Sequence, residues 1–140
     1  MTYAHLLELC LMLAATGQLC IAILNLFLVR IMGWREELAR ISLLIRQVFH
    51  IHVLFISLTL AIFAALTFRF APAISTHPEP IDRWLAFGIG LFWAVRAVLQ
   101  VTYYSSSHWR GIPSRIVVHM ILLVTYPAFA LTYFAAALMK

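Results

Sequence analysis

Three polar residues within one hydrophobic stretch, Arg96, Gln100 and Tyr103, have the spacing of a binding site. They are separated by four and then three residues, so at about 100° per residue they lie on one stripe of a helix. An arginine at membrane depth is energetically costly and usually faces the interior of a bundle, a cavity or a partner. None of the five acidic residues lies inside a hydrophobic span, so no carboxylate is available at the depth of Arg96. The sequence therefore predicts that Arg96 takes its counter-anion from an interface, a lipid or a ligand.

The composition indicates that lipid is the solvent for most of the chain. Of its 140 residues, 64% are hydrophobic and 11% are charged, whereas a soluble domain has about 45–50% apolar and about 25% charged residues. The net charge of +5 comes from arginines that flank hydrophobic spans rather than from an exposed basic stripe. Membrane orientation explains these arginines better than nucleic-acid binding does, so we expect no nucleic-acid partner.

Four long hydrophobic stretches, of which the third carries a charge only at Arg96, predict an all-α integral membrane four-helix bundle that forms a single transmembrane domain over residues 1–140. The expected helices cover about residues 5–31, 36–70, 84–106 and 115–139. Arginines gather in the loops that join the first helix to the second and the third to the fourth. By the positive-inside rule these two loops are cytoplasmic and both termini lie outside. We expect a multi-pass protein of a bacterial inner membrane.

Polar residues from all four predicted helices lie at similar depths near the cytoplasmic side. Together they predict one polar site in the inner third of the bundle that binds an anionic ligand, lipid or cofactor. The predicted site residues are Asn25, Arg30, Gln47, His50, Arg96, Gln100 and Tyr103.

The last helix contributes a further polar face. His119, Tyr126 and Tyr133 are spaced by sevens, so they line one side of that helix, and His119 opens it at the cytoplasmic end.

An arginine in the third of four helices, with a tyrosine seven residues on and another arginine fourteen residues on, resembles the MAPEG family of membrane glutathione transferases and eicosanoid enzymes. Here these positions are Arg96, Tyr103 and Arg110. The resemblance implies a trimer that binds glutathione between subunits, with Arg96 and Tyr103 as glutathione contacts and Arg110 as the catalytic residue that stabilises the thiolate. It also implies a role for Arg30, where the family often has a basic residue.

The second helix departs from the family pattern. The family carries Arg-x-x-x-Asn-x-x-Glu there, and the local match in this chain is Leu43, Gln47 and His50. The arginine and the glutamate are therefore absent, which leaves open whether the chain is an enzyme.

A second alternative is an electron-transfer subunit that binds haem b. Bis-histidine ligation needs two imidazoles on different helices that face each other across the macrocycle. His50 and His119 are predicted at similar depth on different helices, and Arg96 and Tyr103 are placed to hold the haem propionates.

The interpretation that we favour is non-catalytic. It is a small subunit of an oligomeric or larger membrane complex, with membrane lipids, further copies of the chain or other membrane subunits as partners. Glutathione and haem b are the candidate cofactors of the two alternatives.

Overall fold

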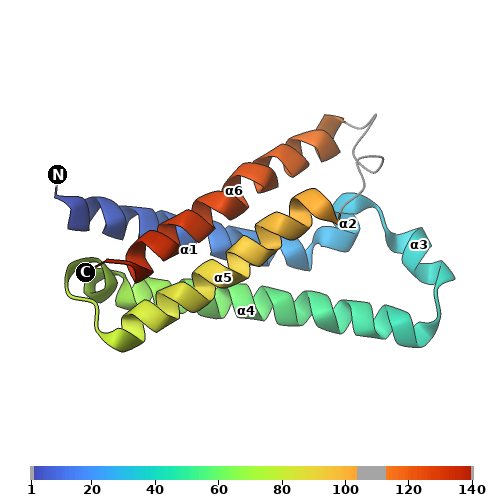
Figure 1. The fold of residues 1–140 in the computed structure, drawn as a ribbon. Coiled ribbons are helices and arrows are strands. Elements are labelled where there is room, and N and C mark those ends of the chain that lie inside the picture. The colour runs from blue at the N-terminus through green and yellow to red at the C-terminus, as the bar shows by residue number, and fades with distance from the viewer. Residues whose placement is uncertain (1, 104–112, 140) are drawn as a thin grey trace. The chain divides into compact units, whose positions relative to one another are not determined.

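The computed structural model describes residues 2–103 and 113–139, and these form helices without any strand. The order of elements is α1 (Tyr3–Leu26), α2 (Leu28–Met32), α3 (Arg35–Arg40), α4 (Leu43–Thr76), α5 (Pro80–Thr102) and α6 (Pro113–Ala137), as Figure 1 shows. Four of these helices, α1, α4, α5 and α6, are long and apolar enough to cross a membrane. The predicted all-α class and the four membrane spans are therefore confirmed, whereas the predicted orientation of the termini stays a prediction.

The chain packs as two compact units. The first unit comprises Met1–Leu11 and Phe70–Lys140, and it contains α5 and α6. The second unit is Met12–Arg69, which contains α2, α3, the second half of α1 and most of α4. The prediction of a single transmembrane domain stays a prediction.

The first span ends earlier than predicted because the chain turns at Phe27. α1 stops at Leu26, and α2 follows as a separate helix. The backbone N–H of Phe27 donates to the carbonyl of Leu24, three residues back, which is the tighter turn common at helix ends. Gly33 then ends α2 with φ of 72°, a left-handed conformation that glycine adopts without a Cβ clash.

The predicted helix over 36–70 is two helices in the structure, α3 and α4. Ile41 has an extended backbone, with φ of −88° and ψ of 160°, so α3 cannot continue through it. Ser42 precedes α4, and its carbonyl accepts the backbone N–H of Arg46. Serine is favoured immediately before a helix because its side chain can satisfy backbone donors there. The short polar helix α3 is thereby separated from the candidate membrane span α4.

α4 also extends beyond its predicted end at residue 70 and runs through Pro72 to Thr76. Proline has no N–H to donate to the preceding turn. The carbonyl of Pro72 accepts two side-chain hydroxyl groups, from Ser75 at 3.1 Å and from Thr76 at 2.8 Å. These bonds satisfy an acceptor at the end of the helix, where no further backbone donors follow.

α5 begins at Pro80, four residues before its predicted start, because Glu79 and Asp82 cap it. The Glu79 side chain accepts the backbone N–H of Asp82, and the Asp82 carboxylate accepts the backbone N–H of Glu79 at 3.0 Å. Pro80 at the first helical position has a backbone angle that already suits a helix. α5 then runs to Thr102 and packs against α6 in the same unit (Figure 1).

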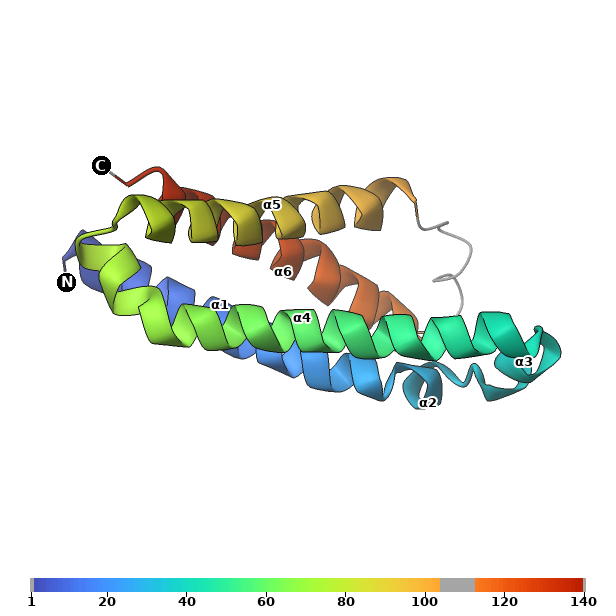
Figure 2. The ribbon, with the colours of Figure 1, turned by 90° about the horizontal axis from the view of Figure 1, so that it is seen from below.

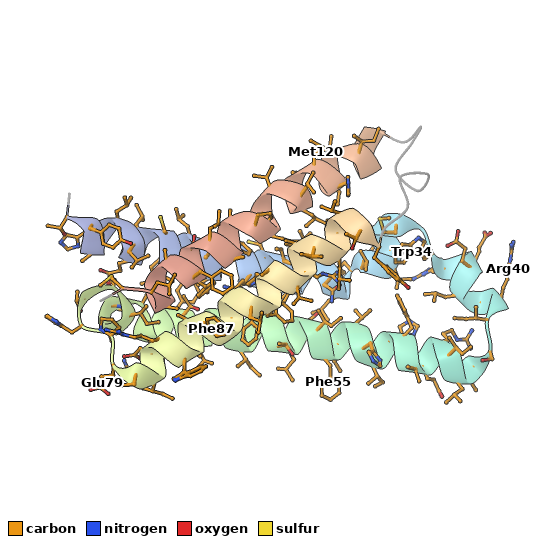
Figure 3. The ribbon with its side chains drawn as sticks, in the orientation of Figure 1. Trp34, Arg40, Phe55, Glu79, Phe87 and Met120 are labelled. Atoms are coloured by element: carbon orange, nitrogen blue, oxygen red, sulfur yellow. The ribbon has the colours of Figure 1, made fainter. Side chains whose placement is uncertain are left out.

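Large apolar side chains project outward from the long helices. Phe55 on α4 is 61% exposed, and Met120 on α6 is 52% exposed; both point away from their helices in Figure 3. In water such surfaces would be unfavourable, but lipid tails solvate them at no cost. The exposed faces thus agree with helices that cross a membrane.

Candidate functional site

Aromatic packing fixes α5 and α6 in an antiparallel register. The Trp93 ring lies 5.1 Å from the Tyr126 ring and 4.9 Å from the Phe129 ring, measured between centroids. One turn earlier, Gly90 allows a close approach, since a Cβ there would lie 3.0 Å from the Phe134 ring. This register determines which residue of α6 faces each polar residue of α5.

Arg96 faces the ring of Tyr126. Its guanidinium carbon lies 5.8 Å from the ring centroid, and the side chain is half-buried. A cation over an aromatic face gains about 0.5–1 kcal/mol at exposed sites and about 2 kcal/mol when desolvated. No described carboxylate of the same unit forms an ion pair with Arg96. The π face of Tyr126 is therefore a neutral partner that leaves the positive charge of Arg96 uncompensated.

One turn along α5, Gln100 bonds to His119 of α6. The Gln100 Nε2 atom lies 2.8 Å from His119 Nδ1, and Gln100 is 3% exposed. The side-chain amide of Gln100 and the Nδ1 atom of His119 thus form a hydrogen bond between α5 and α6. An axial haem ligand needs a lone pair on its coordinating nitrogen. The hydrogen bond engages Nδ1 of His119, and the haem alternative stays a prediction.

Tyr103 and Arg110 are the other two residues of the MAPEG-like pattern. Tyr103 ends α5 and is 79% exposed. Arg110, the predicted catalytic residue, lies outside the described residues. The three residues of the predicted stripe differ in burial: Arg96 is half-buried, Gln100 is buried and Tyr103 is exposed.

In the other unit, Asn25 links α1 to α4, which lie side by side in Figure 2. The Asn25 Nδ2 atom donates to the carbonyl of Val53 at 3.1 Å and to Ser57 Oγ at 3.0 Å. Ser57 in turn donates to the same carbonyl at 2.9 Å. The amide group predicted as a ligand contact thus holds two helices together, a frequent role of asparagine between membrane helices.

A cavity of about 380 Å³ lies among α2, α3 and the start of α4, close to Asn25. Three arginines and one histidine line it together with apolar side chains, and no carboxylate does. We call this cavity the basic pocket, and its lining residues are Leu26, Phe27, Val29, Arg30, Arg35, Leu38, Ala39, Arg46, His50 and Val53.

The basic side chains of the pocket come from three helices. Arg30 lies on α2, Arg35 begins α3, and Arg46 and His50 lie one turn apart on α4. His50 Nδ1 donates to the Arg46 carbonyl at 2.7 Å, which leaves Nε2 as the second polar atom of the ring. Like charges gathered in one concave surface raise the local positive potential and attract anions.

Aromatic contacts hold the pocket's α2–α3 turn against α4. The ring of Trp34, in that turn, meets the ring of Phe49 edge-on at 6.4 Å, and Phe49 meets His50 at 5.8 Å. Edge-to-face pairs of this kind contribute about 0.5–1.5 kcal/mol beyond burial. The arginines on either side of the turn are thereby kept near α4.

The residues predicted to form one site belong to two units. Arg30 and His50 line the basic pocket, Asn25 bonds to a residue that lines it, and Gln47 is exposed on α4 outside its lining. The remaining predicted residues belong to the α5–α6 unit: Arg96, Gln100, Tyr103 and the haem candidate His119.

Sequence reasoning missed two residues of the basic pocket, Arg35 and Arg46. Both were interpreted only as positive-inside residues. Their signal was the four-residue spacing of Arg46 and His50, which places the two side chains on one face of α4. Arg35 is brought to this face by the turn at Gly33, which the sequence pattern did not show.

No protein-family model, curated protein or solved structure matches this chain. The MAPEG resemblance therefore still rests on Arg96, Tyr103 and Arg110 alone and stays a prediction. Among the described residues, no group of three or more histidine, cysteine, aspartate or glutamate side chains is placed to hold a metal ion.

Proposed function

We propose that this chain is a small multi-pass membrane protein that binds the phosphate headgroup of an anionic lipid in the basic pocket. The observation that supports this most strongly is the lining itself, in which Arg30, Arg35, Arg46 and His50 meet without a carboxylate. Three arginines that line one concave surface repel one another and attract an anion, although Arg30, Arg35 and His50 are exposed and Arg46 is half-buried. An anionic ligand relieves that repulsion.

The chemistry of the pocket favours a phosphate group. Guanidinium groups match phosphate oxygens with paired, charge-assisted hydrogen bonds, and several donors can share one phosphate. Leu26, Phe27 and Val53 add an apolar wall that suits the glycerol and the first carbons of the acyl chains. A ligand with a charged head and apolar tails therefore matches both parts of the lining.

The position of the pocket in the chain also favours a membrane lipid. α3 carries Arg35, Glu36, Glu37 and Arg40, and it directly precedes the membrane span α4. A pocket at this junction lies at headgroup depth, and basic pockets between transmembrane helices on the cytoplasmic side bind phosphate-bearing headgroups. The predicted cytoplasmic location of this loop agrees with the anionic inner leaflet.

The proposal is tested by native mass spectrometry of protein purified in a mild detergent. The test variant is the double substitution Arg35→Gln and Arg46→Gln. The matched control is Arg40→Gln, which changes an exposed arginine of α3 that does not line the pocket.

We expect the wild type and the Arg40→Gln control to retain a phosphate-bearing lipid, and the double variant to lose most of it while staying folded. Equal retention by all three proteins would show that the basic pocket is not the lipid site.

A further inference from the structure

A second cavity, of about 500 Å³, lies at the start of α5 and the end of α6, within a single unit. It differs from the basic pocket because its lining is mostly apolar and contains a single charged residue. We call it the Arg83 pocket, and its lining residues are Pro78, Pro80, Arg83, Trp84, Phe87, Ala137 and Leu138.

Rigid groups shape this cavity. Pro78 and Pro80 have restricted backbone angles on either side of the α5 cap. The Trp84 and Phe87 rings meet edge-on at 5.9 Å, and Phe87 contacts the ring of Phe134 on α6 at 5.7 Å. Phe87 points outward from α5 in Figure 3, and Glu79 marks the start of the same helix. Aromatic walls held in this way form a hydrophobic slot.

Arg83 brings an unsatisfied charge to the slot. Its Nε atom is buried and has no hydrogen-bond partner among the described residues. A buried donor without a partner is rare in folded proteins and costly, so it points to a missing acceptor.

The neighbouring carboxylates do not supply that acceptor. Glu79 and Asp82 bond reciprocally to each other's backbone N–H in the α5 cap, and neither lines the pocket. The guanidinium of Arg83 is thus the one cationic group among the described residues of the lining.

We propose that the Arg83 pocket binds a long-chain fatty acid, with the carboxylate on Arg83 and the start of the chain between Trp84, Phe87 and Leu138. One guanidinium matches one carboxylate, because two N–H groups of its planar fork can donate to the two oxygens. The cavity volume is within the range of about 300–1,000 Å³ typical of small-molecule sites. A phosphate headgroup, which carries more acceptor oxygens, suits the single guanidinium of this lining less well.

The position along α5 matches how a fatty acid lies in a bilayer. Arg83 and Trp84 stand at the start of a span that carries no further charge until Arg96. Exposed tryptophan is typical of the membrane interface, and Trp84 is 71% exposed. A carboxylate at this level stays near water while its chain follows the helix into the hydrocarbon. This site is independent of the basic pocket and of its proposed lipid.

The test uses photoreactive palmitate, which carries a diazirine on its chain, and the full chain in nanodiscs of zwitterionic phospholipid. Labelled peptides are mapped by mass spectrometry for the wild type, Arg83→Gln and the control Arg69→Gln, which removes the same charge from an exposed arginine outside this pocket. A third variant, Ala137→Trp, fills the cavity and keeps Arg83. Competition on the wild type uses unlabelled palmitate, methyl palmitate or phosphatidic acid.

We expect labelling within residues 78–87 and 134–139 in the wild type and in Arg69→Gln, and at least tenfold less in Arg83→Gln and Ala137→Trp. Palmitate should compete, and its methyl ester should need at least a tenfold higher concentration. The fatty-acid assignment is overturned if Arg83→Gln labels as well as Arg69→Gln, or if the ester competes equally. It is also overturned if phosphatidic acid competes better than palmitate, which would assign the site to a phospholipid. The competition arms need no variant, so they hold even if a substitution prevents folding.

Discussion

At the scale of single residues, Arg96 and Tyr126 show how this chain carries a charge inside a membrane helix. Placing an arginine at the centre of a membrane helix costs about 2.5–3.5 kcal/mol on insertion scales. The contact with Tyr126, at 5.8 Å, offsets about 0.5–2 kcal/mol of this. The remainder must come from the side chain reaching toward the interface or from an anion. Arg96 therefore stays a predicted ligand contact.

A double-mutant cycle in nanodiscs tests the Arg96–Tyr126 contact. Arg96→Leu should stay folded and be as stable as the wild type or more so, because the desolvation cost disappears. Tyr126→Leu should destabilise the wild type by about 0.5–2 kcal/mol more than it destabilises the Arg96→Leu protein. Tyr126→Phe, which keeps the π face, is the matched control and should show little coupling. Additive effects of Arg96→Leu and Tyr126→Leu would mean that the contact contributes nothing.

The sequence predicted the faces of single helices better than their partners. The spacing by sevens placed His119, Tyr126 and Tyr133 on one side of the last helix, and in the structure all three face α5. The bond from Gln100 to His119 was not predictable, because it depends on the register between two helices and hence on packing around Gly90.

At the scale of elements, the number of spans followed from the length of the hydrophobic stretches, whereas the ends of the helices depended on local hydrogen bonds. The separation of α3 from α4 at Ile41 has no glycine or proline to mark it, and the only signal was Ser42. The start of α5 at Pro80 was visible in principle, since Glu79 and Asp82 have the spacing of a capping box. The sequence pattern instead predicted a start at Trp84, the first residue after Arg83.

The orientation of the elements is tested by cysteine labelling of intact cells with a membrane-impermeant maleimide. The background replaces Cys10 and Cys20 with alanine. Arg40→Cys reports on the α3 loop, and His77→Cys reports on the loop before α5; both positions are exposed. Gly33 is avoided because its positive φ disfavours any side chain. The arginine distribution predicts labelling at position 77 but not at position 40 until the cells are permeabilised. The reverse pattern would invert the topology and move the basic pocket to the outer leaflet.

At the scale of the whole molecule, the three hypotheses of lipid binding, glutathione chemistry and haem binding make different demands on the same residues. Lipid binding needs only the basic pocket, which is formed within one unit. The MAPEG-like hypothesis needs Arg110, which lies outside the described residues. The haem hypothesis needs a coordinating ring nitrogen on His119, whose Nδ1 is bonded to Gln100.

The visible spectrum separates the haem hypothesis from the other two. We expect protein purified from haem-replete cells to show no Soret band, because His119 is engaged by Gln100. A Soret band that either His50→Ala or His119→Ala removes would instead establish bis-histidine haem binding. A band that survives both substitutions would point to contamination rather than to these ligands.

The central claim, that the basic pocket holds the phosphate of an anionic lipid, is tested most directly by an affinity measurement. Native mass spectrometry gives the apparent dissociation constant for one added phosphatidylglycerol in a detergent background. We predict at least a tenfold weaker affinity for Arg46→Gln than for Arg40→Gln, because Arg46 lines the pocket and Arg40 does not. A tenfold change in affinity corresponds to about 1.4 kcal/mol. The Arg40→Gln value should equal that of the wild type. Equal affinities for Arg46→Gln and Arg40→Gln would contradict the account.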